Sequence, residues 1–190
     1  MKNYPAAPPR CDPNTQLRAG VVRKWRRAGS PVTGTVAPMP DLTITTLDAV
    51  TAQLMATVSP TWASAVPAWR RSMDEGRSTL LVALLDGAPV GVAQLVHGVI
   101  PEVCNVGVLA PHRGHGIGSA LMREAERRAA PAGRLRLGVG VDNPSARRLY
   151  ERVGFRPTGE RTTTTYDYVD AEGNTRTATE TDEWMEKILP

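Results

Sequence analysis

The stretch from Val108 to Gly118 constrains this chain more than any other. An apolar, strand-like run ends at Leu109, and Arg-Gly-His-Gly-Ile-Gly (113–118) follows before a helical pattern begins. Glycines let backbone N–H groups turn inward and let an anion approach without interference from Cβ atoms. A helix N-terminus adds partial positive charge at the same place. The segment therefore predicts a strand–turn–helix connection that can hold a phosphate group.

Two common phosphate-binding patterns do not fit this turn. No Lys-Ser or Lys-Thr pair follows Gly118, which excludes the Walker pattern. No acidic residue stands about twenty residues later at a strand end, as the Rossmann pattern requires. Taken alone, the turn is equally compatible with a tight strand–helix connection that binds nothing.

The pattern of apolar and turn-forming residues predicts seven strands and four helices. Strands are predicted over 42–46, 79–85, 89–97, 102–109, 135–141, 158–168 and 175–189. Helices are predicted over 49–58, 62–75, 116–130 and 144–153. This order predicts an α/β fold in which helices cover both faces of a mixed sheet.

Residues 1–40 differ in composition from the rest of the chain. They carry seven Lys or Arg residues against one Asp, together with seven prolines. Such a segment buries too little apolar surface to offset its ordering entropy. We predict a disordered basic Pro/Arg-rich tail over 1–40 without a catalytic role, and one domain over 41–190. An alternative is that translation begins at Met39.

The charge of the predicted domain argues against a nucleic-acid-binding face. Residues 41–190 hold 16 basic and 18 acidic residues, so the basic pI belongs to the tail. Cys11 and Cys104 lie far apart, and neither has a partner at metal-ligand spacing. We therefore expect no metal, reduced thiols and a cytoplasmic protein. The N-terminus lacks the apolar core of a secretory signal, and no apolar run is long enough for a membrane span.

A second motif lies downstream of the glycine-rich turn, Asn143-Pro-Ser-Ala146-Arg-Arg-Leu-Tyr150-Glu-Arg-Val-Gly154-Phe155. The two motifs together resemble the coenzyme A signatures of the GNAT family of N-acetyltransferases, which read Arg/Gln-x-x-Gly-x-Gly/Ala and Asn-x-x-Ala-x-x-x-Tyr-x-x-x-Gly-Phe. The order of predicted elements from Asp41 onward is also similar to that family. The Arg-rich, Lys-poor composition indicates a GC-rich bacterial genome.

The resemblance implies the acyl-CoA N-acyltransferase fold, whose mixed, mostly antiparallel sheet contains a parallel pair that splays apart. Here that pair would be the strands over 102–109 and 135–141. Acetyl-CoA, the cosubstrate, would lie in the splay with its pantetheine arm along Val106 and Val108. The Val108 N–H would polarise the thioester carbonyl. Asn143 would contact the pantetheine, or cap the following helix. The pyrophosphate would bind Arg113, Gly114, His115, Gly116, Ile117 and Gly118.

The resemblance also implies a general acid at Tyr150, whose alternative is packing against the sheet. Glu102 is the candidate base because it stands six residues before Val108, where histone-acetylating members place a glutamate. Strict alternation would put Glu102, Cys104, Val106 and Val108 on one face. The alternatives are a water chain, a purely structural Glu102, or His97 as a proton relay.

The sequence says less about the residues that would bind the acceptor amine. Trp62 and Trp69 lie in the helices that form one wall of the acceptor site in the family, and they serve either as that wall or as packing anchors. Tyr166 carries the same ambiguity. The predicted function is transfer of acetyl to a primary amine of a small molecule by direct attack in a ternary complex.

Several alternatives stay open at this point. They are acetylation of a protein Lys or N-terminus, a nucleic-acid-associated protein that uses the basic tail, and a coenzyme A-binding regulator without catalysis. A homodimer is compatible with the resemblance, and the length of the acyl group is open.

Overall fold

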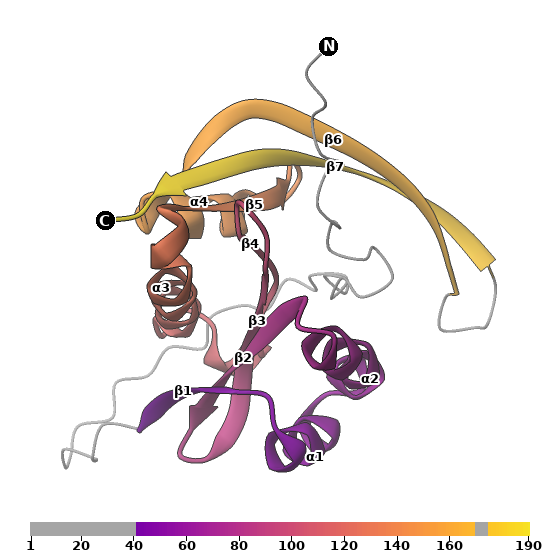
Figure 1. The fold of residues 1–190 in the computed structure, drawn as a ribbon. Coiled ribbons are helices and arrows are strands. Elements are labelled where there is room, and N and C mark those ends of the chain that lie inside the picture. The colour runs from indigo at the N-terminus through magenta and orange to yellow at the C-terminus, as the bar shows by residue number, and fades with distance from the viewer. Residues whose placement is uncertain (1–40, 170–174) are drawn as a thin grey trace, which may run out of the picture.

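The computed structural model describes residues 41–169 and 175–190, so the predicted tail and the turn over 170–174 lie outside the described residues (Figure 1). The strands are β1 (Leu42–Thr46), β2 (Ser78–Leu85), β3 (Ala88–Val96), β4 (Glu102–Val108), β5 (Arg134–Gly140), β6 (Arg156–Val169) and β7 (Thr175–Ile188). The α-helices are α1 (Ala49–Val58), α2 (Pro60–Asp74), α3 (Ile117–Ala129) and α4 (Pro144–Arg152). Short 3-10 turns follow β4 and α3, namely η2 (Ala110–His112) and η3 (Ala130–Ala132).

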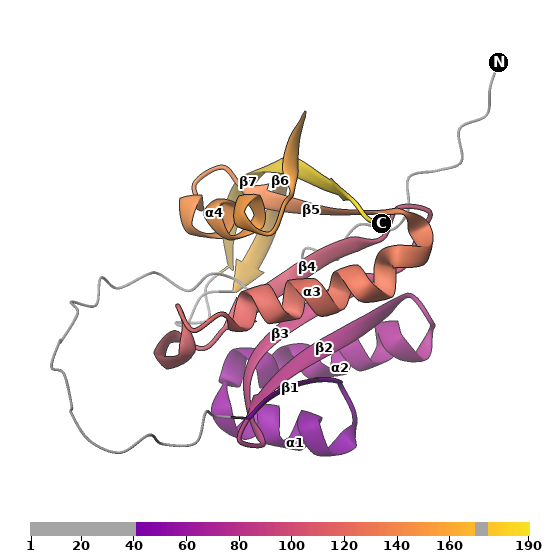
Figure 2. The ribbon, with the colours of Figure 1, turned by 90° about the vertical axis from the view of Figure 1, so that its left-hand side faces the viewer.

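The described strands form one mixed sheet in the order β1-β2-β3-β4-β5-β7-β6. Among them β4 and β5 form the parallel pair, and the other neighbours are antiparallel. Helices α1 and α2 cover one face, and α3 and α4 cover the other (Figures 1 and 2). The predicted fold class and element order are confirmed.

The two faces of the sheet bury separate apolar clusters. One cluster joins α3 and α4 to the sheet and includes Leu121, Leu137 and Phe155. The other joins α1 and α2 to the sheet and includes Met55 and Trp69. We call these faces the α3/α4 face and the α1/α2 face.

The helix starts follow from local sequence. Asp48 caps α1, where its carboxylate accepts the Thr51 N–H at 2.7 Å and the Thr51 hydroxyl bonds back to the Asp48 N–H. This hydrogen bond lowers the pKa of Asp48. Ser59 caps α2, and Pro60 is the first residue of that helix, two positions earlier than predicted. Proline fits there because the first helical N–H has no intrahelical partner.

Strand β4 contains a bulge that alternation does not predict. Asn105 has a φ of 52°, and the pairing with β3 gains one residue in β4 between Cys104 and Gly107. The bulge reverses the direction of every side chain beyond it. Val106 and Val108 consequently pack on the α3/α4 cluster, as Val103 does. The expectation that Glu102, Cys104, Val106 and Val108 share one face is therefore wrong.

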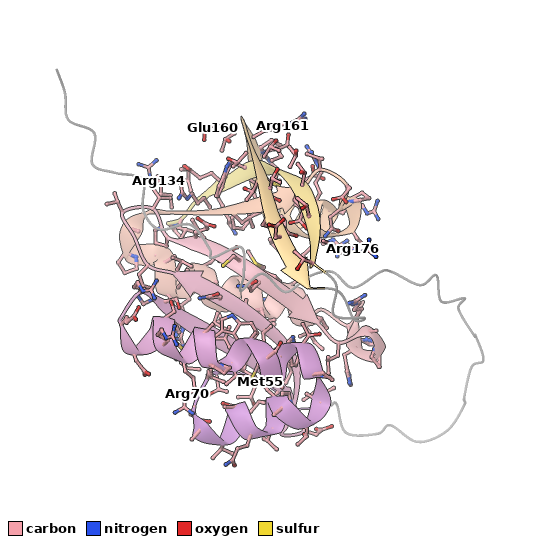
Figure 3. The ribbon with its side chains drawn as sticks, turned by 90° about the vertical axis from the view of Figure 1, so that its right-hand side faces the viewer. Met55, Arg70, Arg134, Glu160, Arg161 and Arg176 are labelled. Atoms are coloured by element: carbon pink, nitrogen blue, oxygen red, sulfur yellow. The ribbon has the colours of Figure 1, made fainter. Side chains whose placement is uncertain are left out.

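Strands β6 and β7 form a long arm. Each has 14 residues, and the arm reaches over the side of the sheet where α1 and α2 lie (Figure 1). Figure 3 looks onto that side, with the arm above the two helices. The arm brings residues near the C-terminus beside the central strands.

Candidate functional site

The centre of the site is the divergence of β4 and β5. In the described residues their parallel pairing has one register pair, Glu102 with Arg136, after which the strands separate. The Leu109 N–H donates to Val90 on β3 at 2.9 Å. Successive amides of a strand point to opposite edges, so the Val108 amide faces the splay. This placement is what the predicted role of Val108 requires.

The turn after β4 presents open backbone. Gly114 and Gly116 both have a φ of 82°, and Gly116 is the N-cap of α3. A Cβ added at either glycine meets no atom within 4 Å. These positions therefore have the room and the N-terminal helix charge that a pyrophosphate needs. Gly118 differs, because a Cβ there would lie 3.1 Å from the Leu149 side chain, so it keeps α3 close to α4.

The Arg113 side chain folds back over the splay. Its Nε donates to the Val108 carbonyl at 2.9 Å, while the side chain stays exposed to solvent. This bond places a guanidinium between the turn and the splay, where its remaining N–H groups can meet an anion. His115 is exposed, whereas the side chain of Ile117 is buried against the sheet and only its backbone N–H is offered to the turn.

Helix α4 carries two of the predicted residues. Asn143 is its N-cap and accepts the Ala146 N–H at 3.1 Å, which confirms the capping alternative. Tyr150 is 7% exposed, lies in the α3/α4 cluster and packs edge-on against Phe155 with ring centroids 6.2 Å apart. Burial raises the pKa of Tyr150 to about 12. The Tyr150 hydroxyl makes no hydrogen bond to any residue in the described part of the chain.

Glu102 is buried and ion-paired. It is 6% exposed, and its carboxylate lies 3.4 Å from the Arg136 guanidinium across the β4–β5 pair. That guanidinium also stacks on Trp184 of β7, 4.8 Å from the ring centre. The candidate base is therefore held by an ion pair and a cation–π contact that together link β4, β5 and β7.

His97 lies at the opposite end of β4 from the glycine-rich turn. Its neighbour Val96 pairs with Glu102, which puts it roughly 15–20 Å along the strand from Val108. One ring nitrogen bonds the Gly76 carbonyl at 2.9 Å, and the other bonds the Thr79 hydroxyl at 3.0 Å. Both nitrogens are engaged, so the geometry does not bring His97 to the splay.

The predicted acceptor-side aromatics separate into two groups. Trp62 and Trp69 are 4% and 0% exposed and pack within the α1/α2 cluster, which supports the packing alternative. Tyr166 lies on the arm, and its hydroxyl donates to the Glu180 carboxylate at 2.6 Å. Of these three, Tyr166 alone has its polar atom on the surface of the arm.

Comparison with known proteins decides the family. The Acetyltransferase (GNAT) family model matches residues 47–155, which is more than half of the chain and includes both motifs. This protein belongs to the GNAT family.

Relatives of this GNAT protein cover it in part. An uncharacterized N-acetyltransferase of Mycobacterium tuberculosis (strain ATCC 25618 / H37Rv) is 35% identical over 94 residues, 47% of this chain and 60% of the relative. Mycothiol acetyltransferase of Nocardia farcinica is 37% identical over 89 residues, 46% of this chain and 29% of the relative. This chain thus spans less than two thirds of the length of these relatives.

Solved structures share its fold. Nourseothricin acetyltransferase has a TM-score of 0.51 and 30% identity, covering 61% of this chain and 68% of its own. An N-acetyltransferase of Staphylococcus aureus Mu50 has a TM-score of 0.59, covering 79% and 99%, and its 17% identity supports the fold alone. None of the helices in the described part of the GNAT protein is both long and apolar enough to cross a membrane.

The expectation of reduced thiols is wrong for Cys104. The structure has this residue in a disulfide, and the rest of that bond lies outside the described residues. Spacing along the sequence does not report which side chains the tertiary fold brings together. The cytoplasmic location stays a prediction.

Asp182 belongs to no motif of the sequence, yet the fold places it beside β5. This carboxylate stands on β7 in register with Gly140 of β5, on the sheet face that also carries Arg136 and Trp184. The available signal was Gly138 and Gly140, since glycines inside a strand often mark the close approach of another group.

Proposed function

We propose that this GNAT protein transfers the acetyl group of acetyl-CoA to a primary amine of a small molecule, by direct attack in a ternary complex. The observation that carries the proposal is the parallel β4–β5 pair, which separates after one register pair beside an open glycine turn. The splay offers the Val108 amide, and the turn offers the backbone N–H groups at the start of α3. Gly114 and Gly116 leave open space at the turn, where an added Cβ would meet no atom within 4 Å.

On the donor side, we assign pyrophosphate binding to the N–H groups of the turn, with Arg113 adding charge. The Val106 and Val108 backbone would pair with the pantetheine amides as a neighbouring strand does. The Val108 N–H would then point at the thioester oxygen, where negative charge develops during attack. The Asn143 side chain, already committed to the α4 N-cap, would contact the pantetheine through its amide NH₂ group.

On the leaving-group side, we assign to Tyr150 the contact with the departing sulfur. The amine nitrogen forms a bond to the acetyl carbon, the carbon–sulfur bond breaks, and the sulfur leaves as a thiolate. A thiol has an ordinary pKa near 8.5, so full proton transfer from a phenol of pKa about 12 is uphill by about three units. Tyr150 would therefore act mainly as a hydrogen-bond donor to the developing thiolate and stay protonated throughout the working pH range.

A small-molecule acceptor is supported by two relatives. They are named for mycothiol and for nourseothricin, at 37% and 30% identity to this chain. The relatives are bacterial, which supports a bacterial source for this chain. The homodimer and the cytoplasmic location remain predictions.

A free-thiol release assay tests the proposal. The protein is incubated with acetyl-CoA and a panel of primary amines, with amine-free and enzyme-free controls, and a thiol reagent reports released coenzyme A. We expect release above the amine-free rate for at least one amine, with the N-acetyl product confirmed by mass spectrometry. Release that is independent of amine would indicate hydrolysis and would sink the proposal.

A further inference from the structure

One carboxylate of the arm lies directly over a strand of the splay. Asp182 faces Gly140 in register, and a Cβ added at Gly138 would lie 3.4 Å from the Asp182 Cβ. A Cβ at Gly140 would lie 2.8 Å from the Asp142 carboxylate and 4.0 Å from the Asp182 carboxylate. The two glycines thus leave space beside β5 for the carboxylates of Asp182 and Asp142.

Asp182 and Tyr150 lie on opposite faces of the sheet. Leu137 and Val139 of β5 belong to the α3/α4 cluster that contains Tyr150. Gly138 and Gly140 alternate with them, so the side chain above these glycines lies on the other face. In acyl transfer the amine attacks the carbonyl carbon from one face of the thioester plane, while the sulfur lies in that plane and leaves from the tetrahedral intermediate, so the two groups can be contacted by different side chains. The arrangement therefore suits an amine that approaches from the Asp182 side and a sulfur that leaves on the Tyr150 side.

Asp182 has no cationic partner within residues 41–169 and 175–190. Its side chain makes no hydrogen bond or ion pair there, although it is half-buried. Three other carboxylates of β4 and β7 do have a cationic partner. Glu102 is paired with Arg136 at 3.4 Å, Glu186 with Arg134 at 3.6 Å, and Glu183 with Arg147.

The surroundings of Asp182 are acidic. Burial first, and then Glu180 on β7 and Asp142 after β5, raise the pKa of Asp182 above its ordinary value. Strand β6 places the uncharged Thr162 opposite it. A carboxylate with a raised pKa is a stronger base, and the surplus negative charge around it favours a cation.

We propose that Asp182 is the catalytic residue that binds the ammonium group of the acceptor and takes its proton. This inference rests on the proposed function and assigns the base to Asp182 in place of Glu102. The ammonium gives one proton to the Asp182 carboxylate, and the neutral amine attacks the acetyl carbon. The second nitrogen proton is lost as the amide forms and ends on the thiolate released from the carbon–sulfur bond. Asp182 then returns its proton to water, so one proton is released per turnover.

The same geometry specifies the class of acceptor. Glu180 and Asp142 are exposed beside Asp182, and Glu180 also accepts the Tyr166 hydroxyl at 2.6 Å. An acceptor with a second amino group places that cation near these two carboxylates while the first reacts. We therefore expect a diamine to be a better acceptor than a monoamine of the same carbon length.

The experiment compares the full-length wild type with Asp182→Asn, Asp182→Glu and Glu160→Gln. Glu160 is an exposed carboxylate of β6, labelled in Figure 3, and its change to Gln removes the same charge. Thiol release is measured with saturating acetyl-CoA, and with 1,4-diaminobutane or n-butylamine as acceptor, between pH 6 and pH 10. Acetyl-CoA affinity and Tm are measured for each variant.

We expect Asp182→Asn to lower kcat/KM for 1,4-diaminobutane about 100-fold at pH 7, as loss of a general base does. The kcat/KM of the variant should rise about tenfold for each pH unit up to the amine pKa near 10, because more of the free amine is then already deprotonated. Asp182→Glu should recover part of the activity, and Glu160→Gln should stay within about twofold. Acetyl-CoA affinity should not change.

The Tm of Asp182→Asn separates a catalytic role of Asp182 from a structural one. If the Asp182 carboxylate stabilised the fold, the variant would have a lower Tm than the wild type. A carboxyl whose folded pKa is raised destabilises the fold when it ionises, so its stability cost is present at neutral pH and fades as pH falls. The variant should therefore match or exceed the wild-type Tm at pH 7. If Asp182→Asn does not fold, Asp182→Thr replaces it, because Thr suits a strand.

Two results overturn this inference. One is an Asp182→Asn variant within about twofold of wild type and with an unchanged pH profile. The other is equal loss of turnover and acetyl-CoA affinity, which would mean structural damage. If the wild-type protein releases no thiol with any amine, the proposed function itself is wrong. That outcome differs from the two above, in which the wild type is active.

Discussion

The donor half and the acceptor half of this molecule are built in different ways. The donor half consists of β4, the glycine turn, α3 and α4, and its contacts are mainly backbone N–H groups supplied by neighbouring residues. The acceptor half consists of the arm and the α1/α2 face, and its groups are side chains such as Asp182 and Tyr166 that the fold collects from distant segments.

This difference explains why the family is clear and the acceptor is not. Backbone donors need glycines and a helix start at fixed spacing, so they leave a motif in the sequence. Side chains on an arm need only to point toward the splay, and many residue types meet that requirement. Variants in the donor half should therefore disturb acetyl-CoA chemistry with every acceptor, whereas variants in the acceptor half should act on particular amines.

The largest effect in the donor half is expected for Tyr150→Phe. We expect kcat to fall at least about tenfold with every amine, since the thiolate loses its hydrogen-bond donor, while acetyl-CoA affinity is retained. Because the pKa of Tyr150 is raised to about 12, the wild type should show no loss of kcat from this group between pH 7 and pH 10. Steady-state thiol release over that range measures both. An unchanged kcat would mean that Tyr150 has only a packing role.

A smaller effect is expected for Gly116→Ala. The new Cβ enters the open space of the turn, so acetyl-CoA affinity should fall about tenfold by calorimetric titration. The matched control is Gly159→Ala on β6, where φ is also positive at 84° and a Cβ also meets nothing within 4 Å. Both variants carry the backbone strain of about 1 kcal/mol, so similar Tm values with different affinities separate strain from binding. Equal affinities would argue against a phosphate at Gly116.

Glu102→Gln tests where the base lies. Removing the partner of the half-buried Arg136 should lower the free energy of unfolding by about 1–3 kcal/mol, measured by urea denaturation. The pH dependence of kcat/KM should keep the wild-type shape if Asp182 is the base. If kcat/KM of Glu102→Gln no longer falls at low pH as that of the wild type does, Glu102 is the base.

The smallest effect on activity is expected for Trp69→Phe. The side chain is fully buried in the α1/α2 cluster, so we expect a stability loss of about 1–3 kcal/mol in thermal unfolding. The KM for the best amine should stay within about twofold. A large rise in KM at unchanged Tm would instead mean that Trp69 takes part in binding the amine.

Most of the fold follows from local sequence signals. The predicted ranges of β1 and α1 match the structure, and β4, α3 and α4 differ from prediction by one residue at their ends. The start of α2 was missed because Pro60 ends one helix pattern and also begins the next. Strong periodicity and capping residues decide such elements before any tertiary contact forms.

The site was predictable where it is contiguous and not where it depends on packing. The turn residues, Asn143 and Tyr150 could be named from their spacing. The bulge at Asn105 could not, since it depends on how β4 registers against β3, and it moved Val106 and Val108 to the other face. Likewise, nothing in the local sequence of Glu102 indicates its ion pair with Arg136.

By itself, the sequence determined the family, the order of elements and the donor turn from Val108 to Gly118, because glycines and helix caps act through the local backbone. The tertiary structure decided that Glu102 is ion-paired and that Asp182, within the described residues, is not. Asp182 lies 42 positions from Gly140 in the chain, yet strand pairing places it over that glycine. Burial and neighbouring charge, which set its affinity for an amine, exist only once the sheet has formed.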